Sequence, residues 1–181
     1  MAESFTNSLG RAVGVVTTAT SGSIGIQTNK VTGISTTGIG VSAIVDNQHY
    51  IAGTKVLNFG TAAQEVVFDR DSTNTASASS QTLKFLGVTT SYTSTAGEKA
   101  ILIGGTFANN TNNQVNLTVS TYDASTSTES AIASKIPVPY GSSFVVSDTG
   151  NTLLEGLDEG RVYCDTANAI DVNLSILKGV S

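Results

Sequence analysis

The chain is poor in the residue types from which catalytic and metal sites are usually built. Its 181 residues include one cysteine, one histidine and no tryptophan. A lone cysteine excludes an intrachain disulfide, and Cys164 is expected to be a small buried core residue. A zinc site or a Ser-His-Asp triad would have to be built on His49, whose neighbours have the composition of a solvent-facing loop. We therefore expect no catalytic residue, no metal ligand and no cofactor.

Charge is also scarce. Charged residues make up 13% of the chain, against roughly 25% in an average soluble domain. The net charge of −5 argues against a nucleic-acid partner, and no Lys/Arg cluster suggests a membrane surface. No apolar run reaches the roughly 20 residues of a membrane-spanning helix, and residues 1–16 lack the features of a signal peptide. We expect a protein without nucleic acid or membrane as partner.

Serine, threonine, asparagine and 18 glycines take the place of the missing charge; these residues favour turns, and threonine also favours strands. Apolar residues do not recur at helical spacing anywhere along the chain. They alternate instead in Gln114–Tyr122, where Val115, Leu117 and Val119 point one way and polar residues the other. The same alternation occurs in Asp171–Leu177. Such a period of two predicts half-buried β-strands.

The stretch Glu98–Asp148 is the centre of the predicted fold. Two apolar strands are joined by an asparagine-rich turn at Asn109–Asn113, and a third strand follows a corner that contains Pro137 and Pro139. About eight such strands over roughly 100 residues predict an antiparallel β-sandwich, jelly-roll-like in character. The predicted strands of this part are 82–85, 91–93, 99–107, 114–122, 131–136, 143–146, 151–154, 161–165 and 171–177.

The composition divides the chain into four parts. Residues 1–22 are predicted to be an N-terminal arm with one apolar patch, and residues 23–75 a small β module. Residues 76–90 contain a linker and the strand that leads into the β-sandwich domain, residues 91–181. The linker signal is Asp71–Gln81, which has no apolar residue larger than alanine. The same stretch could equally be a long loop within one domain.

The C-terminal part resembles a β-sandwich of tailed-phage virion proteins, especially those of cyanophages. The resemblance is carried by SYTSTAGEKAILIGGTFANNTNNQVNLTV (91–119), KIPVPYGSSFVVSD (135–148) and LLEGLDEGRVYCDTANAIDVNLSIL (153–177). The shared features are a Tyr-Thr opening, an Ala-Asn turn, a Pro-x-Gly-Ser corner and an alternating last strand. The family pattern also has a strand with Leu-Glu followed by a turn that contains Asp. The residue before that Asp is often glycine in the family, whereas this chain has Leu157 before Asp158.

Residues 32–75 are similar to a small β module of phage fibres and surface proteins. The matching positions are Ile51, Gly53, Thr54 and Val56, which follow a Gly-Ile start and precede an alternating strand. Together the two resemblances imply a non-enzymatic structural component of a tailed-phage virion, made in the host cytoplasm without a signal peptide. Its first expected role is capsid decoration or cementing. Alternatives are a neck, tail or fibre-attachment protein and a host-surface-binding adhesin.

Such a role implies virion proteins as partners, either major capsid or neck and tail subunits. It also implies a homo-oligomer, with a trimer as the first expectation by analogy of fold. Residues expected to make assembly contacts are the three valines of the N-terminal patch, a local charge pair and an exposed tyrosine, namely Val13, Val15, Val16, Asp69, Arg70 and Tyr140.

The densest acidic stretch contains Glu155, Asp158, Glu159 and Asp165. Oxygen-rich loops can bind Ca²⁺, and paired carboxylates can hydrolyse glycosides. The spacing matches no calcium-loop pattern, and flanking glycines favour a solvated turn. A calcium site at Glu155–Glu159 and a hydrolase that uses Asp158 stay open as alternatives.

Overall fold

The computed structural model describes residues 3–62 and 64–180, with side chains for all of them except 147–151. The regular structure of these residues is all β-strand, and every strand pair is antiparallel. The chain forms two compact units. Unit 1 consists of the residues up to Gly14 together with those from Thr89 onward, and unit 2 is Val15–Val88. Unit 2 is therefore inserted between the first and second strands of unit 1.

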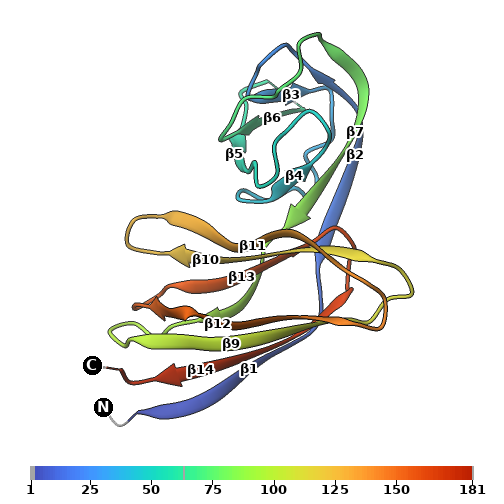
Figure 1. Ribbon diagram of the computed structural model, residues 1–181. Coiled ribbons are helices and arrows are strands. Elements are labelled where there is room, and N and C mark those ends of the chain that lie inside the picture. Colours follow the sequence, from blue (N-terminus) through green and yellow to red (C-terminus); the bar gives the residue numbers. More distant parts are fainter. Residues whose placement is uncertain (1–2, 63, 181) are drawn as a thin grey trace. The chain divides into compact units, whose positions relative to one another are not determined.

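Unit 1 is a β-sandwich of two four-stranded sheets (Figure 1). One sheet has the strand order β1-β14-β9-β12 and the other β11-β10-β13-β8. The strands of unit 1 are β1 (Ser4–Val13), β8 (Thr89–Thr93), β9 (Ala100–Asn109), β10 (Val115–Asp123), β11 (Thr128–Val138), β12 (Ser143–Leu154), β13 (Glu159–Cys164) and β14 (Ile170–Lys178).

The two sheets of unit 1 share one hydrophobic core. Alternate side chains of each strand point into it, as the period of two requires. From β10 these are Val115, Leu117 and Val119, and from β14 they include Ile170 and Ile176, all buried. The side chains between them in each strand face outward, toward solvent or other contacts. The outer faces of the two sheets carry several of the candidate sites described below.

Unit 2 is a six-stranded sheet with the order β4-β7-β2-β3-β6-β5. Backbone hydrogen bonds join its two edges, from Val56 to the Ala43 carbonyl at 2.8 Å and from Val45 to the Thr54 carbonyl at 2.9 Å. The sheet therefore closes around its own hydrophobic core. The strands of unit 2 are β2 (Val15–Ile24), β3 (Lys30–Thr32), β4 (Ile44–Asp46), β5 (Val56–Phe59), β6 (Glu65–Phe68) and β7 (Ala78–Gly87).

The N-terminal segment differs from the predicted arm. Ser4–Val13 is strand β1, and it pairs with β14 in regular register from Ser4 opposite Lys178 to Gly10 opposite Val172. The rest of the predicted arm is β2, which belongs to unit 2. The mostly polar composition predicts an arm, but backbone pairing with β14 holds the segment as an edge strand although its inward-facing residues from Ser4 to Gly10 are also polar or small.

The predicted linker Asp71–Gln81 is not a connection between units. It lies within unit 2, where Ser72 and Asn74 are buried. The Asn74 amide donates to the Gly25 carbonyl at 2.9 Å, and the backbone N–H of Ser72 donates to the Thr28 carbonyl at 2.9 Å. Residues 71–77 are a loop within unit 2, which agrees with the alternative of a loop within one domain, and residues 78–81 begin β7. The chain passes between units at Gly14–Val15 and Val88–Thr89 instead.

Candidate functional site

The three valines expected to contact a neighbouring subunit lie in different surroundings. Val13 ends β1 and is buried in the core of unit 1, so its side chain stabilises the fold of a single chain. Val15 and Val16 are in β2 of unit 2, where Val15 is exposed and Val16 is half-buried. The structure thus separates residues that are neighbours in the sequence.

The other expected contact residues are at the surface. Asp69 and Arg70 follow β6, and their side chains approach to 3.9 Å. The Asp69 carboxylate also accepts the backbone N–H of Lys55 at 2.8 Å, which gives it a local structural role. Tyr140 lies in the turn after β11 and is highly exposed. These three residues remain predicted assembly contacts.

The acidic turn between β12 and β13 is organised around Asp158. Its carboxylate accepts the backbone N–H of Glu155 at 2.9 Å and that of Ala124 at 3.0 Å, and the residue is 8% exposed. The turn is also held by Ser94, whose hydroxyl donates to the Glu155 carbonyl and whose backbone N–H donates to the Asp158 carbonyl at 2.9 Å. One oxygen of Asp158 therefore closes the β12–β13 turn itself, and the other ties that turn to the β10–β11 hairpin.

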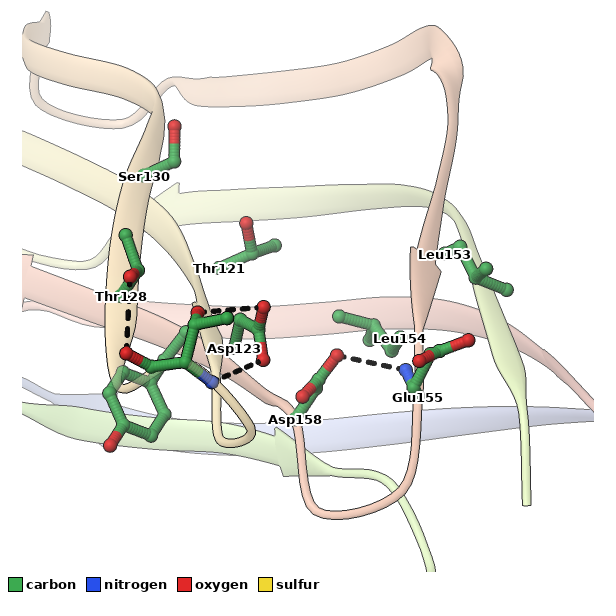
Figure 2. Close-up of a pocket in the computed structure, with 10 residues that line it drawn as sticks. Thr121, Asp123, Thr128, Ser130, Leu153, Leu154, Glu155 and Asp158 are labelled. Carbon is green, nitrogen blue, oxygen red and sulfur yellow. Dashed lines mark hydrogen bonds between the residues drawn. The ribbon is translucent and has the colours of Figure 1, made fainter. Parts of the chain in front are cut away.

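A groove of about 470 Å³ opens between this turn and the hairpin (Figure 2). Figure 2 shows Thr121, Thr128 and Ser130 on one side and Glu155 on the other. Its lining is rich in hydroxyl and carboxylate groups, with two leucines at one end. Such a lining offers hydrogen bonds to a polar, uncharged ligand.

Asp123 is the second carboxylate of the groove, and it is occupied by its own turn. It accepts the Ser125 hydroxyl at 2.7 Å, the Ser125 N–H at 2.8 Å and the Thr126 hydroxyl at 2.8 Å. These hydrogen bonds, that of the Ser125 side chain first, lower the pKa of Asp123 to about 2. The carboxylate is thus held ionised and cannot act as a general acid near neutral pH.

The arrangement of acidic groups bears on the calcium and hydrolase alternatives. Among the described side chains, no three from histidine, cysteine, aspartate or glutamate are placed to hold a metal ion. Asp158 and Asp123 each use their oxygens to accept hydrogen bonds from the protein itself. The geometry is that of a stabilised turn.

A buried ion network lies on the outer face of the sheet β11-β10-β13-β8 of unit 1. The Arg161 guanidinium contacts the Glu129 carboxylate at 2.9 Å and the Glu159 carboxylate at 2.8 Å. Glu129 also accepts the hydroxyls of Ser120 and, at 2.9 Å, Tyr163. The Glu129 and Arg161 side chains are only 6% and 12% exposed. Because the ionised groups are paired and hydrogen-bonded, their burial is tolerated, and the network joins β10, β11 and β13.

Two tyrosines complete this network. The Arg161 guanidinium lies 3.7 Å from the centre of the Tyr122 ring, a cation–π contact. Burial, followed by the charge of Glu129, raises the pKa of Tyr163 well above its usual value. Tyr163 therefore stays neutral, and its hydroxyl donates a hydrogen bond to Glu129. The cluster is saturated with internal partners, and its role is to hold strands together.

The outer face of the sheet β1-β14-β9-β12 carries a row of apolar side chains. Cross-strand register places Phe5 opposite Leu177, Leu177 opposite Ile101, and Ile101 opposite Leu153. Phe5 is 78% exposed and Leu153 46% exposed, and the two between them are half-buried. Leu9 and Val145, on the same face of β1 and β12, are 74% and 54% exposed. We call these six residues the outer apolar face.

His49 and Cys164, the two other residues with potential for chemistry, lie outside the acidic turn, the groove, the ion network and the outer apolar face. The backbone carbonyl of His49 accepts the Thr73 N–H at 2.8 Å, in the loop after β4. Cys164 is buried, as expected, and burial raises the pKa of its thiol to about 12. A thiol with so high a pKa is not a nucleophile near neutral pH.

Comparison with protein-family models, with curated proteins and with solved structures finds no match for this chain. Among the described residues, no helix has the length and apolar character needed to cross a membrane.

Sequence reasoning missed both the ion network and the outer apolar face. Arg161, Glu129 and Ser120 are far apart in the sequence, and only the pairing of β10 with β11 and β13 brings them together. One signal was available for the apolar face. In β1, Phe5 and Leu9 alternate with polar residues at even spacing, which is compatible with a strand whose apolar face is turned outward.

Proposed function

We propose that the protein is a non-enzymatic structural component of a tailed-phage virion, most simply a capsid decoration or cement protein. It would bind capsid or neighbouring virion subunits through the outer apolar face. The motif resemblance of residues 91–177 and 32–75 suggests the virion, and the all-β architecture agrees with that resemblance. The function needs no cofactor, and its partners are other proteins of the particle.

The outer apolar face is the observation that carries this proposal. Soluble proteins seldom leave a contiguous apolar surface uncovered, and such surfaces usually mark a place of protein contact. Here the row crosses all four strands of one sheet. The carboxylates that would be needed for catalysis are instead bound to backbone groups or to Arg161. Binding is therefore better supported than turnover.

We further infer that the sandwich of unit 1 is a jelly roll. The support is the strand order. Counted in chain order, its eight strands form sheets with the orders 1-8-3-6 and 5-4-7-2. Two interleaved Greek keys produce this arrangement, which is common among viral capsid proteins. It is an architectural likeness and does not by itself indicate a position on a particle.

The copy number of the chain in purified particles tests this proposal. Quantitative mass spectrometry would compare it with the major capsid protein of the phage that encodes the chain. We expect near-stoichiometric abundance, as a shell-covering decoration protein requires. A few copies per particle would favour a neck, tail or fibre-attachment role instead. Absence from the particles would contradict a virion component.

The groove of Figure 2 favours a second candidate, a host-surface-binding adhesin. Its hydroxyl and carboxylate lining is suited to the hydroxyl groups of an envelope glycan. Against this, one face of Tyr122 is covered by Arg161, so the groove has little aromatic surface for stacking on a sugar. Saturable binding to host cells, lost in a Thr128→Val/Ser130→Ala variant, would support the adhesin. Absence of binding to host cells and to isolated envelope glycans would exclude it.

A further inference from the structure

Strand β1 is an edge strand that is open to pairing. It is bonded to β14 on one side and to no described strand on the other (Figure 1). Its ten residues contain no proline, and its register with β14 is regular from Ser4 to Gly10. A long, regular edge presents a row of backbone N–H and C=O groups that can pair with another strand.

The other sheet edges among the described residues are shorter or interrupted. The β11 edge contains Pro137 and a left-handed Lys135, with two register shifts against β10. The β12 edge has a register shift between Ser147 and Thr152. Strand β8 has five residues, and the edges of unit 2 are joined to each other. Proline, bulges and short strands are the usual protections of an edge, and β1 has none of them from Ser4 to Gly10.

We propose that β1 pairs antiparallel with β1 of a second copy of this chain, about a two-fold axis at Asn7. The side chains that face outward along this segment are Glu3, Phe5, Asn7, Leu9 and Arg11, since Ser8 points inward and donates to the Ser91 carbonyl. With Asn7 opposite Asn7, Phe5 lies opposite Leu9 and Glu3 opposite Arg11. The segment is thus complementary to itself in both charge and hydrophobicity.

Other registers lose this complementarity. Moving the axis to Ser8 places Phe5 opposite Arg11, and moving it to Thr6 places Glu3 opposite Leu9. A shift of the pairing by one residue would place outward-facing side chains opposite inward-facing ones. Cross-strand pairs of opposite charge and of apolar residues stabilise antiparallel strands, so the Asn7-centred register is the preferred one.

The surroundings of Arg11 fit an added carboxylate. In one chain Arg11 lies near Asp171 on β14, whose carboxylate accepts the Ala12 N–H at 2.7 Å. That hydrogen bond, with a smaller contribution from Arg11, lowers the pKa of Asp171. In the paired state Arg11 would lie between Asp171 and Glu3 of the second copy. Pairing would also make one eight-stranded sheet, in which the exposed Phe5 and Leu9 cover one another.

The test is a charge swap on the full chain, followed by light scattering with size-exclusion chromatography across a range of concentrations. Wild type is expected to be a dimer. Arg11→Glu and Glu3→Arg each place like charges opposite one another and are expected to weaken dimerisation by roughly tenfold or more. The double variant Glu3→Arg/Arg11→Glu is expected to restore it. A mixture of the two single variants should form mixed dimers, because each then meets its complement.

Two controls make the test specific. Lys84→Glu carries the same charge change at an exposed position of β7 in unit 2 and is expected to leave dimerisation unchanged. Under oxidation, Asn7→Cys is expected to form an intermolecular disulfide and Phe5→Cys to form little, since only position 7 lies opposite itself. The native Cys164 is buried and does not interfere. Circular dichroism would verify that the variants, all at exposed positions, stay folded.

A monomer at every concentration, a trimer, or a dimer that does not respond to the charge swap would each overturn this proposal. The result is separable from the proposed function, which it deepens without requiring it. A chain found in particles but monomeric would keep the virion role and remove the β1 pairing. A chain that dimerises as described but is absent from particles would keep the β1 pairing and contradict the virion role.

Discussion

Leu157 has a backbone conformation that is normally reserved for glycine. It precedes Asp158 in the β12–β13 turn with a φ of 74°, in the left-handed region where a β-carbon is crowded by the neighbouring carbonyl. Its side chain is 54% exposed, so little packing offsets the strain. This is also the position at which the phage-protein pattern that the sequence resembles often has glycine. The departure noted in the sequence is therefore a site of local strain.

We expect Leu157→Gly to stabilise the protein. Relief of the left-handed strain outweighs the added entropy of the unfolded chain, for a net gain of about 0.5–1 kcal/mol in the free energy of unfolding. Leu157→Ala is the matched control, because it removes the same side chain but keeps the β-carbon, and it should bring no gain. Urea denaturation would measure both. Equal effects of the two substitutions would show that the backbone conformation is not the cause.

At the scale of elements, β11 depends on a single buried carboxylate. Two register shifts interrupt its pairing with β10, and Glu129 near its start links it to Ser120 on β10 and to Arg161 and Tyr163 on β13. Removal of one member of a buried ion pair leaves the other charge without compensation, which costs more than the pair itself contributes. The network therefore fixes the start of β11, which the two register shifts separate from the rest of its pairing with β10.

We expect Glu129→Ala to destabilise unit 1 by about 3 kcal/mol and to raise the amide hydrogen exchange of β11 before that of β9 or β14. Glu155→Ala is the control. It breaks an ion pair with Lys99 in which both side chains are at least half exposed, a loss of at most about 1 kcal/mol. Thermal denaturation and hydrogen-exchange mass spectrometry would measure the two effects. If both variants lose the same small amount of stability, the network has no special role.

At the scale of the whole molecule, unit 2 is an insertion with its own core and a closed sheet. Its first and last strands are neighbours, with Val15 opposite Gly87 in the β2–β7 pair. The two points where the chain enters and leaves unit 2 are therefore adjacent. Insertions of this kind are tolerated because neither unit needs the other to complete its hydrogen bonding or its core.

We expect residues 15–88 to fold when expressed alone. Their adjacent ends and separate core should produce a cooperative thermal transition near that of unit 2 in the full chain, measured by circular dichroism and calorimetry. The shorter segment 23–75 serves as the comparison, because it has the boundaries predicted from composition. It lacks β7 and most of β2 and should not fold. A non-cooperative 15–88 would mean that unit 2 depends on unit 1 for its stability.

Local pattern predicted many strands well. The predicted strands 99–107, 114–122 and 171–177 agree with β9, β10 and β14 to within two residues at each end. The alternation in Gln114–Tyr122 correctly placed Val115, Leu117 and Val119 in the core, but Thr118 and Ser120 on the other face are buried as well. The predictions of a buried Cys164 and of a turn at Glu155–Glu159 rest on similar local signals. Only the carboxylate of Asp158 was unexpected, because its partner Ala124 lies on another hairpin.

The amino-acid sequence by itself determined that this protein is all-β, because strand periodicity, turn residues and the lack of helical stripes are local properties. Only the tertiary structure decided that residues 4–13 are the edge of the sandwich and that residues 15–88 are an insertion. The reason is that β1 pairs with β14, at the opposite end of the chain. Strand pairing depends on register between distant segments, and so do the faces that remain exposed for binding.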